Sequence, residues 1–276
     1  MKVDGIEIEL DDRHSVFLAS AGSGAEIVLL HGALATHEDW LAGPFPSLTQ
    51  CGRVLAVDLP GHGRSARARL EAEPRLQGAQ IHAALSRLGT GPRVIVGHSF
   101  GGLVALAYAE QFPDAVSQLV LLSPIAFPEV RLEHLQFGPR AFPLAGPAIA
   151  TLASGLDRPA IKLMHELMFW PQSVPDEWSR RYPWEHILSP QSGIAHGEDA
   201  AAIHPAAAFD WIDFSAIPRP ARILAGRSDL IVRCERHARP LSALMPGSEL
   251  IEVEDVGHMI HHSRPDLLVA AVRDAC

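Results

Sequence analysis

Alternating and consecutive apolar positions recur along the chain and predict its strands. Ile6, Ile8 and Leu10 alternate with glutamates, a period of two that is typical of a half-buried strand. A polar turn follows, and residues 14–19 can return as the hairpin partner. Later runs are apolar at consecutive positions, interrupted only by Arg222 and Glu252, as in strands of a parallel sheet that are buried on both faces. They occupy residues 27–30, 54–57, 94–96, 119–122, 222–225 and 250–253.

Helical patterns lie between these runs. Apolar residues recur at near-helical spacing from Leu76 to Leu88, and residues 103–110 are rich in helix formers and stop near Pro113. Pro265 starts a last helix over 266–274, from a position where proline is tolerated. Strands that alternate with helices predict an α/β fold: a mostly parallel, eight-stranded sheet with helices on both faces.

One long segment lacks buried-strand runs. Residues 124–220 hold 13 of the 22 prolines and four of the five tryptophans. A helix is expected over 157–169, with Ile161 and Met164 on its buried face. We interpret residues 124–214 as a mainly helical cap inserted into a core made of 1–123 and 215–276, because so long a structureless loop is uncommon. The cap tryptophans are Trp170, Trp178, Trp184 and Trp211.

Composition narrows the class of protein. A chain of 276 residues with 47% hydrophobic and 20% charged residues suits a globular protein with a sizeable core. The net charge of −9 argues against nucleic acid or an anionic membrane as partner. Three cysteines, widely spaced, suggest neither a disulfide framework nor a zinc site. The N-terminus lacks a signal-peptide pattern, so a cytoplasmic protein is expected; a monomer and a homodimer are not distinguishable.

The strongest chemical signal is Gly97-His98-Ser99-Phe100-Gly101. It is a G-x-S-x-G motif directly after a predicted strand and before a predicted helix, the context that a nucleophile elbow requires. Glycines two positions either side leave room for the sharp turn, which exposes the serine oxygen at the carboxyl end of the sheet. Ser99 is therefore the candidate nucleophile.

An acid and a base follow in the order Ser, Asp, His. Asp229 comes after the run 222–225, at the carboxyl end of a strand, where it can orient a histidine. Asp255 is its nearest rival. His258 follows a glycine after the last strand and precedes the last helix, and His261 and His262 are competitors within one turn.

A loop after the run 27–30 completes the candidate site. The backbone N–H of Ala33, with that of Leu34 as second choice, can join the N–H of Phe100 in an oxyanion hole. The segment 58–65 is interpreted as a tight turn that adds no catalytic group. His261-His262 and His37-Glu38-Asp39 lack a zinc-type spacing and are expected to be surface polar residues, so no metal and no cofactor are predicted.

These motifs together resemble the α/β-hydrolase superfamily, in the branch with a helical cap after the sixth strand. The residues that carry the resemblance span positions 31 to 265. Within them, the spacing from His258 to Pro265 matches the family pattern and selects His258 over its neighbours. One departure is Ser263, where relatives often carry an acidic residue. The carrying segments are residues 31–32, 58–65, 97–102, 226–229 and 257–258 with Pro265.

The resemblance implies a serine hydrolase whose expected partner is a small-molecule substrate, with no cofactor. A serine at the nucleophile position favours acyl transfer over the chemistry of aspartate-dependent relatives. The leading hypothesis is hydrolysis of a small apolar carboxylic ester. The alternatives are a C–C bond hydrolase of dienoate ring-cleavage products and a slow-turnover ligand receptor. Leu34, Phe127 and Trp170 are the candidate substrate-binding residues, and aromatic cap residues are expected to make the pocket apolar.

Overall fold

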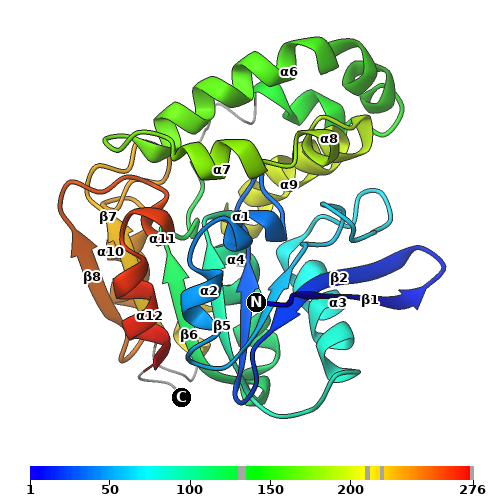
Figure 1. Cartoon of the computed structure of the whole chain (residues 1–276). Helices are drawn as coiled ribbons and strands as arrows, with labels where there is room; N and C mark the ends of the chain where they lie inside the picture. The colour runs from blue at the N-terminus through cyan, green and yellow to red at the C-terminus, as the bar shows by residue number, and fades with distance from the viewer. Residues whose placement is uncertain (130–134, 209–211, 218–220, 274–276) are drawn as a thin grey trace.

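An eight-stranded sheet forms the centre of the protein (Figure 1). The computed structural model describes residues 1–129, 135–208, 212–217 and 221–273. The strand order is β1-β2-β4-β3-β5-β6-β7-β8. The predicted fold class is confirmed, since the last six strands lie on the apolar runs and the first two form the expected hairpin. The strands are β1 Asp4–Asp11, β2 His14–Ala21, β3 Glu26–Leu30, β4 Arg53–Val57, β5 Arg93–His98, β6 Val116–Leu122, β7 Ala221–Gly226 and β8 Glu249–Val253.

The strand register places six carboxyl ends at one edge of the sheet. β1 and β2 form an antiparallel hairpin, and β2 also pairs antiparallel with β4. The remaining neighbours, from β4 through β3 to β8, are parallel. Loops that leave β3, β5, β7 and β8 therefore meet at the same edge, where open α/β sheets bind their ligands.

Two separate apolar cores lie on the two faces of the sheet, and successive strand residues alternate between them. Val28 and Leu30 pack into one core, whereas Ile27 and Leu29 pack into the other. This alternation explains why β3 is apolar at consecutive positions. The first core is covered by α3 Pro74–Ser86, α4 Phe100–Gln111 and α10 Ala238–Leu244, and the second by α1 His37–Leu41, α2 Phe45–Leu48, α11 Ile260–Ser263 and α12 Pro265–Arg273.

Further helices, α6 to α9, lie between β6 and β7 in the sequence, and α6 extends across the top of the molecule in Figure 1. We call them the helical layer: α6 Gly146–Phe169, α7 Asp176–Arg181, α8 Trp184–Ile187 and α9 Pro190–Ala208. Short 3-10 helices span Pro113–Ala115, Gly138–Ala141 and Phe214–Ala216. Trp211, counted with the cap tryptophans, lies outside the described residues. In the described ranges, no helix has the length and apolarity to cross a bilayer.

The helix predicted over 157–169 begins earlier, at Gly146, and its expected start is wrong. Two prolines, Pro147 in the first turn and Pro159 inside the helix, obscured its length in the sequence. A proline is tolerated in a first turn, where the missing N–H has no helical partner. The expected apolar face is present, because Ile161 and Met164 are buried.

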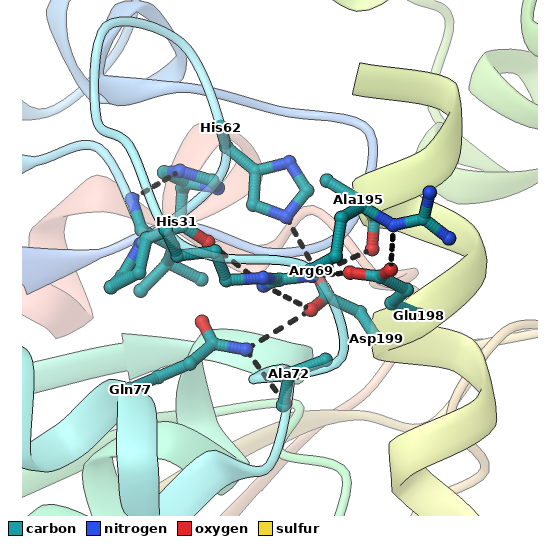
Figure 2. Close-up of polar contacts among 11 residues, drawn as sticks. His31, His62, Arg69, Ala72, Gln77, Ala195, Glu198 and Asp199 are labelled. Atoms are coloured by element: carbon teal, nitrogen blue, oxygen red, sulfur yellow. Dashed lines mark hydrogen bonds and ion pairs between the residues drawn. The ribbon is translucent and has the colours of Figure 1, made fainter. Parts of the chain in front are cut away.

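A buried polar network ties α9 to the core (Figure 2). Asp199 accepts hydrogen bonds from His62 Nε2 at 2.5 Å, Arg67 Nη1 at 2.7 Å and Gln77 Nε2 at 3.0 Å. The neighbouring Glu198 pairs with Arg69. Three of these donors come from the segment between β4 and α3, so the turn predicted over 58–65 contributes to anchoring the helical layer.

Candidate active site

Ser99 lies in a strained turn between β5 and α4. Its φ of 54° and ψ of −116° are unusual for a residue with a side chain. A Cβ on Gly97 would lie 2.5 Å from the carbonyl oxygen of Gly101, and one on Gly101 would lie 2.4 Å from that of His31. Glycine is thus required on both sides, and the serine occupies the sharp strand-to-helix turn that the motif predicts.

His258 and Asp229 form a buried hydrogen-bonded pair. His258 Nδ1 donates to Asp229 Oδ2 at 2.8 Å. Asp229 Oδ1 accepts the backbone N–H groups of Ile231 at 2.7 Å and Val232 at 2.8 Å. Because a carboxylate only accepts, Nδ1 carries the proton and the lone pair of the neutral ring lies on Nε2. The carboxylate is held from both sides and fixes the tautomer of the imidazole.

His98 links the nucleophile turn to the base. Its Nε2 donates to the backbone carbonyl of His258 at 3.1 Å, and the two rings lie 4.6 Å apart between centroids. Burial, with nearby histidines, holds the pKa of His98 well below its usual range, so this ring is neutral. The residue next to Ser99 therefore supports the loop that carries His258. Sequence reasoning missed this role, because the x position of the motif carries no chemical signal of its own.

The rival residues have other contacts. His261 Nε2 and His262 Nε2 each donate to the carboxylate of Asp39 at 2.9 Å. Asp255 has a left-handed φ of 54° in the turn after β8, and its carbonyl accepts a hydrogen bond from Gln172. The pairing at Asp229 is therefore made by His258.

The expectation that His261-His262 and His37-Glu38-Asp39 are surface residues is wrong. His37, Asp39 and His261 are buried, and only Glu38 is substantially accessible. The error arose because partners more than 200 residues apart in the chain satisfy each other's polar groups, and no local pattern reveals that contact.

The loop after β3 packs directly on the nucleophile turn. A Cβ on Gly32 would come within 3.1 Å of the Ser99 Cβ, so the residue before Ala33 packs closely against the nucleophile turn. Leu34 has a left-handed φ of 56°, and its carbonyl accepts the Tyr182 hydroxyl at 2.7 Å. Phe100 is the first residue of α4, where backbone N–H groups have no partner within the helix.

The three candidate substrate-binding residues have different surroundings. Leu34 is buried in a cluster with Phe137 and with Met168 and other apolar residues of the helical layer. Phe127 is half-buried and packs edge-on against Phe214, with ring centroids 5.8 Å apart. Trp170 is 56% exposed at the end of α6. The substrate-binding roles of Leu34, Phe127 and Trp170 therefore stay predictions.

Within the described part of the chain, two groups of buried side chains have ligand atoms close enough to share a metal ion. Asp39, His98 and His261 form one, and His62, His196 and Asp199 form the other; in each, the ligand atoms lie within 4.8 Å of one another. In both groups the carboxylate already accepts several N–H donors, and in the second it also pairs with a guanidinium. This arrangement satisfies the carboxylates without an ion.

Comparison with known proteins agrees with the fold and the motifs. The Alpha/beta hydrolase family model matches residues 27–271. An uncharacterised protein of Mycobacterium tuberculosis is 30% identical over 261 residues, covering 89% of this chain and 73% of the relative. A pimeloyl-[acyl-carrier protein] methyl ester esterase of Methylococcus capsulatus is 29% identical, covering 88% and 91%. A thermophilic esterase from Thermogutta terrifontis superimposes with a TM-score of 0.74 at 22% identity, covering 98% and 97%.

The family match extends over most of the chain and includes all the strands of the parallel sheet. The chain therefore belongs to the Alpha/beta hydrolase family. The fold, the turn at Ser99 and the buried Asp229–His258 pair are consistent with a hydrolase.

Proposed function

We propose that the protein is a serine hydrolase that cleaves a small apolar carboxylic ester with Ser99, His258 and Asp229. The observation that carries the proposal is the hydrogen bond of 2.8 Å between His258 and Asp229 at the edge of the sheet where Ser99 occupies its strained turn. A nucleophile, a base and an orienting acid are recognised by such geometry and not by sequence position.

The chemistry then follows from the tautomer of His258. Its Nε2 lone pair accepts the proton of the Ser99 hydroxyl while Oγ attacks the ester carbonyl. Asp229 stabilises the imidazolium that forms. The protonated ring returns the proton to the leaving alcohol, which departs and leaves an acyl-enzyme. Water then attacks the acyl group while His258 accepts a proton from it. The protonated ring returns this proton to Ser99 Oγ, so the carboxylic acid is released and the free serine is regenerated.

The negative charge on the carbonyl oxygen needs donors that are already in place. In this proposal the backbone N–H groups of Phe100 and Ala33 supply them. Support comes from the position of Phe100 at the start of α4, where N–H groups point away from the helix, and from the close packing of Gly32 on Ser99.

The preference for a small apolar ester rests on what surrounds Leu34. The buried Leu34 joins an apolar cluster that includes Met164, Met168, Phe169 and Trp178 of α6 and α7. Ser99 itself is only 3% exposed, so the helical layer acts as the cap of the site in this proposal. Two relatives named esterases, the one from Methylococcus capsulatus and one from Mycobacterium tuberculosis at 26% identity, support ester chemistry.

Replacing Ser99 with alanine tests the proposal. The S99A variant should lose roughly three to six orders of magnitude in turnover of a short aryl ester while it keeps its fold. A fluorophosphonate probe should label the wild type at one site and leave S99A unlabelled. Labelling that persists in the variant would assign the nucleophile to another residue.

A substrate panel separates the ester hydrolase from the alternatives. Esters of increasing acyl length, a lactone and a dienoate ring-cleavage product are compared at equal concentration. Fastest turnover of short esters supports the proposal. Fastest turnover of the dienoate would assign C–C bond hydrolysis instead, and stoichiometric labelling without turnover of any compound would favour a receptor.

A further inference from the structure

Asp39 is a buried carboxylate that connects three elements. It lies on α1 and accepts His261 Nε2 on Oδ2 and His262 Nε2 on Oδ1, each at 2.9 Å. The indole Nε1 of Trp178, from α7 of the helical layer, donates to Oδ1 at 2.7 Å. Asp39 thus joins the core, the helix that follows His258 and the helical layer through one side chain.

The charge of Asp39 is maintained although it is only 4% exposed. Burial disfavours the ionised form, but the imidazoles of His261 and His262 outweigh that cost and hold the pKa of Asp39 well below its usual range. Burial lowers the pKa of His261 to about 4, so this ring donates as a neutral group. Hydrogen bonds to an ionised acceptor are stronger than neutral ones, so the three donors are held firmly.

The contacts continue from Asp39 to the candidate base. The His261 ring packs 4.5 Å from the ring of His98, measured between centroids. His98 in turn donates to the carbonyl of His258, which also accepts the backbone N–H of Ile260 at 2.9 Å. Since α11 begins only two residues after His258, an anchor on α11 restricts the loop that aims the imidazole.

We propose that Asp39 is a positioning residue, which fixes α11 and thereby the orientation of His258 while it docks the helical layer through Trp178. This inference rests on the proposed role of His258 as general base. It assigns a function to a buried acid that contacts neither Ser99 nor Asp229 in the hydrogen bonds described above. A small misplacement of a catalytic group lowers the rate of the chemical step without removing any reacting atom.

The labelling rate of Ser99 tests this role. Asp39→Asn keeps the size of the side chain but presents an amide N–H₂ to ring or indole donors, so at least one hydrogen bond is lost. A fluorophosphonate probe measures two quantities: the rate per site and the final stoichiometry. In D39N we expect the final stoichiometry of labelling to remain complete. The labelling rate per site, and kcat for a short aryl ester, should each fall by about ten- to a hundredfold.

A purely structural role gives a different result. If Asp39 serves only to hold the fold, the D39N variant shows a reduced labelled fraction at the wild-type rate per site. Full labelling at the wild-type rate would also overturn the proposal. Failure of the proposed function is distinguishable, because wild-type protein would then remain unlabelled.

Two variants of His261 provide a matched pair if D39N does not fold. His261→Gln retains an amide N–H₂ at the reach of Nε2, whereas His261→Leu retains bulk without a donor. The inference requires a slow labelling rate in H261L and recovery of most of the wild-type rate in H261Q. Equal rates in the two variants would contradict it. Trp178→Phe removes only the donor from α7 and should alter KM more than kcat.

Discussion

The backbone carbonyl of Met168, in the last turn of α6, accepts the backbone N–H of His258 at 3.1 Å. The next residue, Met259, donates to the same oxygen at 3.2 Å. The end of the helical layer is therefore hydrogen-bonded to the loop that carries the candidate base. The end of α6 and the backbone of His258 are joined through this carbonyl, whereas Asp39 contacts the helical layer through Trp178 of α7.

Gly257→Ala should disrupt this contact. A Cβ at residue 257 would lie 1.8 Å from the carbonyl oxygen of Trp170, a backbone atom that cannot rotate away. Forced shifts of this kind cost about 1–3 kcal/mol of unfolding free energy. We expect lower stability in urea denaturation and at least a tenfold loss of kcat. Gly155→Ala, the same substitution at an open position of α6, should instead stabilise by up to about 1 kcal/mol. Equal effects of the two changes would contradict the contact.

Asp229→Asn should lower kcat by about four orders of magnitude, because the amide favours the wrong imidazole tautomer. The fold should be retained, since the Asn oxygen can still accept from Ile231 and Val232. Asp255→Asn is the matched control on the rival acid and should retain near-wild-type turnover. The measurement is steady-state hydrolysis of an aryl ester. A dead D255N with an active D229N would exchange the two roles.

The pH dependence of stability should report the His37–Asp58 pair. Burial opposes protonation of His37, but its hydrogen bonds and charge interactions with Asp58 and Glu38 outweigh burial and raise its pKa to about 9. A raised pKa stabilises the fold fully below about 6.5, and this contribution is lost as pH rises through about 9. The stability gap between wild type and His37→Gln should therefore be largest near pH 6 and shrink toward pH 10 in urea denaturation.

A matched substitution separates this effect from general alkaline destabilisation. His186→Gln changes an exposed histidine of α8, and its stability difference from wild type should stay small across the same pH range. A gap between wild type and H37Q that widens with rising pH would show that the imidazole is not the stabilising cation.

Local sequence patterns were sufficient to predict the sheet and the turn at Ser99. Apolar runs identify β3 to β8 because strands buried on both faces must be apolar at consecutive positions. Gly97 and Gly101 identify the elbow because any Cβ there would meet a backbone oxygen. Each of these constraints acts over a few residues and is therefore visible in the sequence.

Contacts between distant segments left no such signal. Asp39 and Asp199 look like ordinary surface acids, yet each is buried and accepts donors from more than 120 residues away. The early part of α6 was missed for a local reason, since Pro147 and Pro159 are poor helix formers and its leucines, Leu152 and Leu156, are exposed. Buried polar networks depend on the fold that brings their members together, so they become recognisable only in three dimensions.

The network around Asp199 yields the last prediction. Asp199→Asn leaves His62, Arg67 and Gln77 with an amide in place of a carboxylate. The Arg67 guanidinium then loses the nearer of its two buried carboxylate partners and keeps Glu198 at 3.4 Å. Removing one partner of a buried ion pair costs about 3–5 kcal/mol. We expect a lower free energy of unfolding in urea denaturation. Hydrogen exchange should be faster than in the wild type, with a larger increase in α9 than in β5. Glu177→Gln, which removes an exposed carboxylate paired with Arg181, should change neither quantity appreciably.

The dependence of unfolding free energy on pH in the acidic range provides an independent check on Asp199. Burial disfavours the Asp199 carboxylate, but the charge of Arg67 and the contact with His62 lower its pKa to about 2. A lowered pKa stabilises the fold above the ordinary value near 3.8 and loses that contribution as pH falls toward 2. The gap between wild type and D199N should therefore stay constant from pH 7 to about 4 and narrow below that. A gap that already closes between pH 7 and pH 5 would contradict a lowered pKa for Asp199.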